Sequence, residues 1–416
     1  MTSIRDALNY QKNELEAKPA ERYIARKETI NGSDSDLIKV IIGPRRAGKS
    51  FFAIHALSHM GTFGYVNYDD ETLANAGDYN DVIEEVNSIY SKPRYLLLDE
   101  IQNLDKWELF VNRLQRQGYN LVITGSNSNL LSLELSTHLT GRHVVTRILP
   151  LSYLEIINSY NRNLTESQYR VILSEYLTNG GYPEPFVKKL SYSEYLSTLF
   201  ASVVYKDIVR RYRVRKPRTI DELAEYLISN TSREFSYTRL ANMTGLKSAH
   251  SVKRYIDFLK ESFIFFELER YSTKVSEKVK ANKKMYCIDN GFIRSNAYKN
   301  SRDRGVLYEN TVAVELLRRS HGGKFKLYFW KDDQHHEVDF VVKQGEMIKE
   351  LIQVCSDPSE TFTMEREVRS LITGSELLGC KQLLVITDSV ERTEKRKWYG
   401  ATRNIKYIPL WKWLIS

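Results

Sequence analysis

One eight-residue stretch constrains this chain more than any other feature of its sequence. Residues 43–50 read GPRRAGKS and fit the pattern G-x-x-x-x-G-K-[ST] at every fixed position. The stretch follows LIKVII at 37–42, a β-branched run that predicts a buried strand. It precedes FFAIHALSHM at 51–60, which predicts a helix with Gly61 as its C-cap. A strand, a glycine loop and a helix in this order predict a phosphate-binding loop.

The residues of this loop have separate roles in the prediction. Gly43 and Gly48 permit a tight backbone path, so that successive N–H groups point inward at phosphates. The positive end of the following helix adds to that attraction. Lys49 would reach the β- and γ-phosphates of ATP, and the hydroxyl of Ser50 would ligate Mg²⁺. The predicted nucleotide contacts are Gly43, Pro44, Arg45, Arg46, Ala47, Gly48, Lys49, Ser50 and Phe51.

A second apolar strand ends in two adjacent acids. Residues 94–100 read RYLLLDE, and the acids are Asp99 and Glu100. Downstream of a phosphate-binding loop, Asp99 is predicted to hold Mg²⁺ through its water shell. Glu100 is predicted to polarise the attacking water as a general base. The pair therefore predicts hydrolysis of the bound nucleotide as well as its binding.

A third strand is predicted over residues 120–124, and small polar residues follow it. Ligands of open parallel sheets lie at the carboxyl ends of the strands, so Ser126 or Asn127 is a candidate sensor of the γ-phosphate. A plain N-cap turn that opens a helix around Leu130 explains the same residues equally well. Both interpretations stay open at this point.

Composition narrows the class of protein. The 416 residues are too many for one ordinary domain, and the hydrophobic fraction of 42% is enough for several cores. No stretch approaches the roughly 20 apolar residues of a membrane-spanning helix, and the charged N-terminal segment has no apolar signal core. Three scattered cysteines are too few for a disulfide framework or a four-ligand zinc site. We therefore expect a cytoplasmic protein.

Positive charge is concentrated in the second half of the chain. Residues 205–219 contain seven bases and one acid, and residues 270–304 contain ten bases and three acids. Such clusters are able to follow a phosphate backbone electrostatically. Solvated helix faces and loops are an equally good interpretation of the charge alone.

The middle of the chain predicts two helical regions. Residues 153–205 indicate helices that are interrupted by GGYPEP at 180–185, and this region is expected to form a lid over the nucleotide. Residues 217–271 indicate three helices with a turn at Gly245, followed by a strand, which is a helix-turn-helix outline of winged-helix type. The donors expected on its recognition helix are Lys247, Ser248, His250, Ser251, Lys253 and Arg254. A basic wing over 274–284 would add to DNA binding, whereas winged helices also serve purely for packing or dimerisation.

The order of these motifs resembles a known family. GPRRAGKS, LLLDEIQNLDKW, ITGSNSNLLS, LTGRHVVTRILPLSYLEI and GGYPEPF occur in this order along the chain. Together they resemble archaeal and bacterial AAA-type P-loop ATPases with a C-terminal domain of unknown function that is similar to restriction nucleases. The resemblance implies an α/β fold with a parallel sheet that carries an additional strand, in which Asp99 and Glu100 are the Walker B pair. It also nominates Arg142 as an arginine finger, often supplied by a neighbouring subunit, with a structural salt bridge as the rival interpretation.

The last third of the chain is similar to the α/β core of PD-(D/E)xK nucleases. Such a site needs acids for a divalent metal and a lysine near the attacking water. Glu309 and Asp339 match two of the acids, but the strand expected to read acid-x-Lys reads Gln353-Val354-Cys355. We therefore expect a degenerate nuclease-like domain.

These observations predict five regions. They are an N-terminal helical segment (1–36), an ATPase core (37–152), a helical lid (153–216), a winged helix (217–285) and a nuclease-like domain (286–416). The leading hypothesis is a Mg²⁺-dependent ATPase that couples its nucleotide state to DNA, without a membrane partner. A homo-oligomer is a further candidate partner, since an arginine finger that acts in trans would require one. The alternatives are an ATP-gated switch in which hydrolysis is incidental and, less favoured, an ATP-dependent nuclease.

Overall fold

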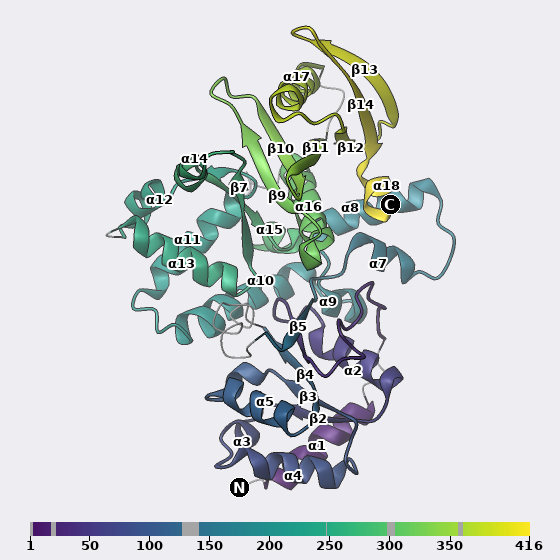
Figure 1. The fold of residues 1–416 in the computed structure, drawn as a ribbon, viewed down its shortest axis with the longest axis vertical. Helices are drawn as coiled ribbons and strands as arrows, with labels where there is room; N and C mark the ends of the chain where they lie inside the picture. The colour runs from purple at the N-terminus through teal and green to yellow at the C-terminus, as the bar shows by residue number, and fades with distance from the viewer. Residues whose placement is uncertain (1–2, 18–21, 127–140, 247, 298–303, 357–360) are drawn as a thin grey trace. The chain divides into compact units, whose positions relative to one another are not determined.

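The chain is divided into two compact units. The computed structural model describes residues 3–17, 22–126, 141–246, 248–297, 304–356 and 361–416 (Figure 1). The first unit contains residues 1–151 with 186–188 and 261–263, and the second unit contains the remaining residues up to 416. In the part of the chain that is described, no helix is long and apolar enough to span a membrane.

The first unit is built on a parallel sheet of five strands. Their order is β2-β3-β4-β1-β5, so that β4 separates β1 from β3, as the family resemblance implies. The strands are β1 (Ile38–Ile42), β2 (Phe63–Asn67), β3 (Tyr95–Asp99), β4 (Asn120–Gly125) and β5 (His143–Arg147). The helices of this unit are α1 (Ile4–Ala17), α2 (Lys49–Met60), α3 (Glu71–Ala74), α4 (Tyr79–Ile89) and α5 (Trp107–Arg116).

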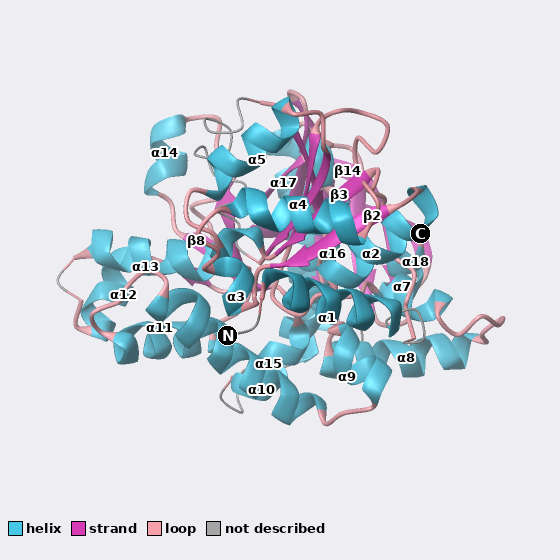
Figure 2. Cartoon of the chain, turned by 90° about the horizontal axis from the view of Figure 1, so that it is seen from below, coloured by secondary structure: helices cyan, strands magenta, loops and turns pink. Residues whose placement is uncertain are grey.

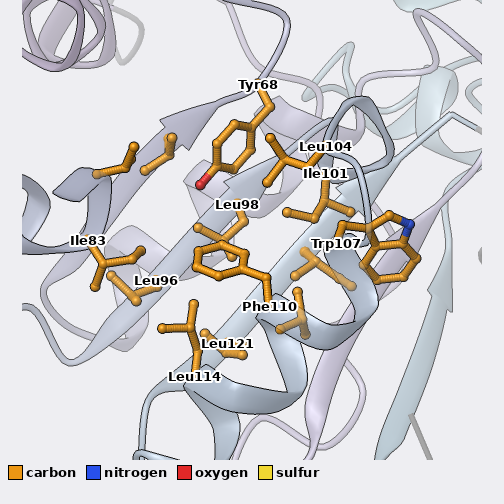
Figure 3. Packing of buried hydrophobic residues seen from close by; sticks show 14 of the residues in the cluster. Tyr68, Ile83, Leu96, Leu98, Ile101, Leu104, Trp107, Phe110, Leu114 and Leu121 are labelled. Atoms are coloured by element: carbon orange, nitrogen blue, oxygen red, sulfur yellow. The ribbon is translucent and has the colours of Figure 1, made fainter. Parts of the chain in front are cut away.

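Both faces of this sheet are covered, which explains why its strands are apolar throughout. All five residues of β3 are buried, and successive side chains point to opposite faces. Leu96 and Leu98 pack in the cluster that contains Phe110 of α5, whereas Leu97 packs in a second cluster with Phe52 of α2. Figure 3 shows the first of these clusters, with Phe110 beside Leu98. The two cores hold the carboxyl ends of the strands in fixed positions.

The second unit contains a mixed sheet of nine strands. Their order is β13-β14-β12-β11-β10-β9-β7-β8-β6. The strands are β6 (Glu234–Phe235), β7 (Phe265–Arg270), β8 (Lys283–Cys287), β9 (Lys326–Lys331), β10 (Glu337–Gln344), β11 (Met347–Cys355), β12 (Leu383–Thr387), β13 (Arg392–Trp398) and β14 (Ala401–Pro409). Strands and the helices around them are distinguished by colour in Figure 2.

Helices precede and cover this sheet. Those between 153 and 216 are α7 (Tyr153–Asn158), α8 (Glu166–Asn179), α9 (Pro183–Lys188), α10 (Tyr192–Ser202) and the π-helix η4 (Val203–Arg210). The later helices are α11 (Pro217–Ser229), α12 (Tyr237–Thr244), α13 (Ala249–Glu261), α14 (Val275–Lys280), α15 (Asn290–Asn296), α16 (Arg304–Arg319), α17 (Thr361–Leu378) and α18 (Leu410–Ile415). Helix α8 begins at a capping box of Thr165 and Gln168, and it ends at Gly180.

The glycines at 180 and 181 do more than form the predicted turn. The buried carboxylate of Asp289 accepts hydrogen bonds from the N–H groups of Gly181 (2.7 Å) and Gly291 (2.8 Å). A Cβ atom on Gly180 would lie 1.7 Å from Oδ1 of Asp289, so any side chain there would displace the carboxylate. Burial raises the pKa of Asp289 to about 7, although the two N–H donors and Arg318 oppose that shift.

Residues 217–287, which we call the helical module, contain the predicted helix-turn-helix. The order of elements is α11, β6, α12, α13, β7, α14 and β8, and Gly245 ends α12 in the left-handed conformation. In both views the three longer helices lie together (Figures 1 and 2). β8 pairs with β6 on one side and with β7 on the other, both antiparallel.

The segment 274–284 differs from the predicted basic wing. It contains the short helix α14, and four of its five lysines are paired with acids, whereas Lys280 is exposed. The ion pairs are Lys274–Glu277 (2.8 Å), Lys278–Glu269 (2.7 Å), Lys283–Glu267 (2.8 Å) and Lys284–Glu337 (2.6 Å). Three of the four partners come from β7 and β10 and are not visible in the local sequence, so these pairs reduce the positive charge that the sequence predicted for a basic wing.

The helical module and the C-terminal strands share one continuous sheet. β7 pairs with β9 in parallel through Glu269↔Tyr328 and Arg270↔Phe329, and the N–H of Tyr271 donates to the carbonyl of Phe329 (2.7 Å). The predicted boundary at 285/286 falls inside β8, a central strand of this shared sheet.

Candidate functional site

The loop between β1 and α2 has the backbone shape expected of a phosphate-binding loop. Gly43, Arg46 and Gly48 have positive φ angles of 154°, 63° and 91°. A Cβ atom on Gly43 would lie 1.8 Å from the carbonyl oxygen of Ile148, so only glycine fits there. The N–H of Ala47 donates to the carbonyl of Pro44 (3.2 Å), which closes a tight turn at the positive end of α2.

Lys49 lies between this loop and the acids that end β3. Its side chain is buried, and Nζ donates to the carbonyl of Pro44 at 3.0 Å. The same nitrogen is 4.0 Å from Oε1 of Glu100. Arg45 is in the same loop, and Phe51 is half-buried in the first turn of α2. The loop and the β3 acids therefore form one charged cluster.

Asp99 is surrounded by hydroxyl donors. Ser50 Oγ donates to Oδ1 at 2.9 Å, Tyr65 OH donates to Oδ2 at 3.0 Å, and Thr124 Oγ1 also donates to Oδ1. Burial and the neighbouring Glu100 raise the pKa of Asp99, and the hydroxyl donors oppose that shift. A hydroxyl and a carboxylate in contact at the foot of a phosphate-binding loop form the donor set that Mg²⁺ prefers.

Glu100 adopts a conformation that turns it away from the strand. Its φ angle is 51°, in the left-handed region that residues with side chains rarely adopt. Ser126 Oγ donates to its carboxylate at 3.2 Å, and Gln102 Nε2 donates to the same oxygen. Burial would raise the pKa of Glu100, but Lys49, Gln102, Arg45 and Ser126 outweigh burial and lower it. The carboxylate is therefore ionised at neutral pH and available as a proton acceptor.

Three residues of this site were not predicted from the sequence. Arg26 donates from NH1 to the carbonyl of Leu149 (2.9 Å) and from NH2 to that of Ala47, which fixes the loop from outside. Tyr65 and Thr124 complete the shell around Asp99. Thr124 ends an apolar strand and was a visible candidate, whereas nothing in the local sequence marks Arg26 or Tyr65.

One predicted residue, Arg142, is not part of this cluster. Arg142 immediately precedes β5, and its carbonyl accepts from the N–H of Ile38 (3.0 Å), at the amino end of the sheet. The phosphate-binding loop follows the opposite end of β1. The exposed side chain of Arg142 is thus a strand length from the loop of its own chain. Asn127 lies outside the described residues, as does Lys247.

The acids predicted for the nuclease-like site do meet, but a lysine lies between them. Nζ of Lys284 on β8 is 3.1 Å from Glu309 Oε1, 2.6 Å from Glu337 Oε1 and 3.5 Å from Asp339 Oδ1. Burial opposes the charge of Lys284, yet Glu309 and the other anionic neighbours raise its pKa well above the usual value. Lys284 was counted only as part of a basic cluster by the sequence analysis.

This arrangement does not fit a divalent metal ion. Gln353 occupies the position of an acid, and its side chain accepts from the N–H of Asp339 (3.2 Å) and donates to Glu367. Among the described residues, no group of three or more His, Cys, Asp or Glu side chains is arranged to hold a metal ion. The ammonium of Lys284 already balances the carboxylates, at distances typical of hydrogen bonds.

A second surface combines α13 with the first basic cluster. Tyr212 stacks on Phe258 of α13, with ring centroids 3.9 Å apart and planes 5° apart, and the guanidinium of Arg254 lies 5.8 Å from the same Phe258 ring. The stacked rings therefore place Tyr212, which lies within the first basic cluster, against the predicted recognition helix. We call this the basic surface, and its exposed bases are Lys206, Arg210, Arg213, Arg215, Lys216, Lys253 and Arg254. In the described part of the chain, none of these seven forms an ion pair.

Comparison with protein families divides the chain into three matches. Residues 35–157 match an AAA domain family. Residues 170–302 match a domain of unknown function, DUF8612, and residues 304–413 match another, DUF4143. The first match covers the phosphate-binding loop and the acids of β3.

Whole-chain relatives come from archaea and bacteria. An uncharacterized protein of Methanocaldococcus jannaschii is 33% identical over 94% of this chain and 93% of its own length. An uncharacterized protein of Haemophilus influenzae is 31% identical over 79% of this chain and 84% of its own length.

Solved structures give more distant similarities. The Walker-type ATPase PABY2304 of Pyrococcus abyssi is 14% identical, with a TM-score of 0.41, over 71% of this chain and 97% of its own. The Aeropyrum pernix ORC1 protein in complex with DNA has a TM-score of 0.29 at 14% identity, over 75% of this chain and 94% of its own. The sequence relatives, the domain order and the sheet topology together place the chain in the family of archaeal and bacterial AAA-type P-loop ATPases whose AAA domain is followed by two domains of unknown function.

Proposed function

We propose that the protein is a Mg²⁺-dependent ATPase that hydrolyses ATP at the first unit. The observation that carries this proposal is Glu100, an ionised carboxylate held beside Lys49 in a strained backbone conformation. A loop that only bound nucleotide would not need an ionised acid at this position. Glu100 accepts the proton of the attacking water, and Lys49 holds the β- and γ-phosphates.

Ser50 and Asp99 are the residues that would hold the magnesium ion. The ion neutralises charge on the phosphates when bound. Tyr65 donates to Oδ2 of Asp99 and Thr124 donates to Oδ1, so that the carboxylate keeps one position. Arg26 keeps the loop closed through the carbonyl of Ala47.

The test is ATP binding and turnover measured on the full chain. We expect Lys49→Ala to lose nucleotide binding. We expect Glu100→Gln to keep binding and to lose turnover by at least a hundredfold, because a general base contributes roughly 10²–10⁴-fold. Normal turnover by Glu100→Gln would contradict the assignment of the base.

We also propose that the second unit contacts DNA and that the nucleotide state controls this contact. The order of elements in the helical module is that of a winged helix, and α13 carries the exposed Lys253 and Arg254. The Tyr212–Phe258 contact supports this proposal, because Tyr212 belongs to the first basic cluster and stacks on the same helix. Such a surface follows the phosphates of a duplex.

The test of this contact is the ATPase rate with and without duplex DNA over a salt series. We expect stimulation that weakens steeply with salt, and we expect Lys253→Ala with Arg254→Ala to reduce it. A flat response would instead support the alternative function, an ATP-gated switch with incidental hydrolysis. In that case the Glu100→Gln variant, which binds ATP without hydrolysing it, would keep the biological effect of the protein.

We propose that Arg142 acts as an arginine finger on the nucleotide that a neighbouring copy of the chain binds. The amino end of β5 places it away from the loop of its own chain, so only a second copy can receive it. Mixing Arg142→Ala with Lys49→Ala protein tests this role. In the mixture, some active sites combine an intact Lys49 from one chain with an intact Arg142 from another, and these sites should recover turnover. If turnover is not recovered, Arg142 is not an arginine finger.

A nuclease function is disfavoured by the position of Lys284. Its ammonium lies among the carboxylates where a metal ion would be needed. We expect no cleavage of DNA with Mg²⁺ or Mn²⁺. Cleavage that Asp339→Ala abolishes would restore the nuclease hypothesis.

A further inference from the structure

The hairpin of β13 and β14 extends beyond the sheet that carries it. β12 pairs with β14 only from Ile405 to Pro409, whereas β13 pairs with β14 as far as Trp398↔Ala401. Residues 395–404 therefore extend as two strands with no further strand beside them in the described part of the chain, and we call the hairpin of residues 392–407 the ribbon. Figure 1 shows it in yellow, beside α17.

The inner face of the ribbon is fastened to α17. The guanidinium of Arg369 lies 4.5 Å from the Trp398 ring, and Arg403 Nε donates to Ser375 Oγ at 2.7 Å. Arg403 also pairs with Glu376. These contacts hold the ribbon in one orientation, so that its outer face is presented in a fixed position.

The outer face carries positive charge without acids. Side chains of a strand alternate between its faces, and the register places Thr393 opposite Lys406, Lys395 opposite Asn404, and Lys397 opposite Thr402. All six side chains are exposed. In the described part of the chain the three lysines form no ion pair, whereas Arg392 and Arg396 are paired with Glu394.

The tip of the ribbon is an exposed aromatic residue in an unusual conformation. Tyr399 and Gly400 form a two-residue turn with φ angles of 42° and 82°, a geometry that favours Asn-Gly. The Tyr399 side chain is 90% exposed, more than any other large hydrophobic residue in the described part. Its ring meets the Trp398 ring at 80° with centroids 4.8 Å apart, which orients it and leaves its faces open.

Protection of a sheet edge does not account for these features. Lysines on an edge strand prevent pairing with another chain, and this explains Lys395 and Lys397 on β13. Lys406 is on β14, which has a neighbour on each side at that position. An exposed tyrosine at the tip would weaken such protection.

We propose that the ribbon binds a single strand of nucleic acid. The phosphates lie along the face of Lys395, Lys397 and Lys406, and an unpaired base stacks on Tyr399. Lysines that follow a backbone beside an aromatic platform are the combination that binds single strands without sequence preference. The ribbon lacks the broad apolar surface that a lipid interface requires, since Tyr399 is its one large exposed apolar residue among those described.

The first test removes the charge. The full chain without nucleotide is titrated with a fluorescent single-stranded oligonucleotide over a salt series. Replacing Lys395, Lys397 and Lys406 by alanine should weaken binding about tenfold or more near 0.1 M salt and reduce the log–log salt slope by about 2. A matched triple replacement of the exposed Lys324, Lys326 and Lys349 makes the same change in net charge and should leave binding unchanged. Equal losses for the two triple variants would overturn the proposal.

The second test separates binding from folding. Tyr399→Asn suits the turn, so its unfolding midpoint should equal or exceed that of the wild type. Its affinity for the single strand should fall about tenfold, in the range measured for loss of one stacked base. Its affinity for a blunt duplex should stay constant, whereas the Lys253→Ala and Arg254→Ala pair should lower the latter. Unchanged single-strand affinity, or binding of anionic phosphatidylserine vesicles in its place, would refute the assignment.

Discussion

Asp99 and Glu100 are adjacent in the sequence, yet their carboxyl groups have opposite pKa shifts. Burial and its neighbour raise the pKa of Asp99, which has only hydroxyl donors around it. The left-handed turn at Glu100 directs the next carboxylate toward Lys49, and its pKa is lowered. One backbone angle therefore gives two neighbouring acids the separate environments that the proposed roles of metal holder and proton acceptor require.

Gly43 offers a test of the loop at the same scale. A Cβ atom at this position would lie 1.8 Å from the carbonyl oxygen of Ile148. We expect Gly43→Ala to lower the free energy of unfolding by about 3 kcal/mol or more and to abolish nucleotide binding. Gly77→Ala is the control, because its added Cβ has no atom within 4 Å. Chemical denaturation measures both, and equal stability of the two variants would show that the loop tolerates a side chain.

Asp289 predicts a pH dependence of stability. Because its pKa is about 7 in the folded chain and near 3.8 when exposed, the folded state binds an extra proton between these values. The free energy of unfolding should therefore decrease by about 4 kcal/mol as pH rises from 4 to 8, and this contribution should be constant above about pH 8.

The variant Asp289→Asn isolates this contribution. It loses one acceptor for the N–H groups of Gly181 and Gly291, which costs about 1 kcal/mol, but it has no titrating carboxyl group. Urea denaturation at several pH values compares the two proteins. A slope between pH 4 and 7 that is the same in both would contradict the prediction.

At the scale of elements, strands and helices with a regular apolar pattern were predictable from the sequence. The strand before Gly43, the strand that ends at Asp99 and the helices around Gly245 were all predicted close to their observed bounds. The partners of buried charges were not predictable, because Lys284 on β8 and the acids on α16 and β10 are distant in sequence. The cation that pairs with these acids thus comes from a strand that the nuclease-like pattern does not include.

The lysine-centred cluster predicts how the second unit responds to metal ions. Lys284→Ala leaves Glu309, Glu337 and Asp339 together without their shared cation, which should cost about 3–5 kcal/mol of stability. We expect millimolar Mn²⁺ or Ca²⁺ to raise the melting temperature of this variant and to leave the wild type unchanged, in thermal melts without nucleotide.

Lys284→Met is the matched control for this prediction. Its side chain fills the space of the ammonium group but carries no charge, so the variant should be destabilised without being rescued by metal ions. Specific stabilisation of the wild type by a divalent ion would show that its cluster accepts a metal after all.

At the scale of the whole molecule, the two units present different problems for prediction. The topology of the first unit followed from a motif with a fixed structural context. In the second unit, the pairing of β7 with β9 joins two regions that the sequence divided at 285/286. Only two residue pairs of the described strands make that connection, and no pattern in the sequence of either strand predicts it.

Fragments test this continuity. Residues 288–416 alone lack β7 and β8, so β9 becomes an unpaired edge and the acids lose Lys284. We expect this fragment to aggregate or to lack a cooperative melting transition, whereas residues 152–416 should be soluble and fold. Size-exclusion chromatography and circular dichroism distinguish the two results. A monomeric 288–416 fragment with a sharp transition would show that the sheet is divisible there.

The shared sheet also bears on how such chains are assembled during evolution. Gene fusion usually exchanges segments whose backbone hydrogen bonds are formed within the segment. A break at 285/286 would instead divide β8 and interrupt its hydrogen bonds to the neighbouring strands. We therefore expect the C-terminal strands to keep their structure only together with the three strands that precede them. In a chimera, the strands before and after 285/286 would have to come from the same protein for either group to keep its structure.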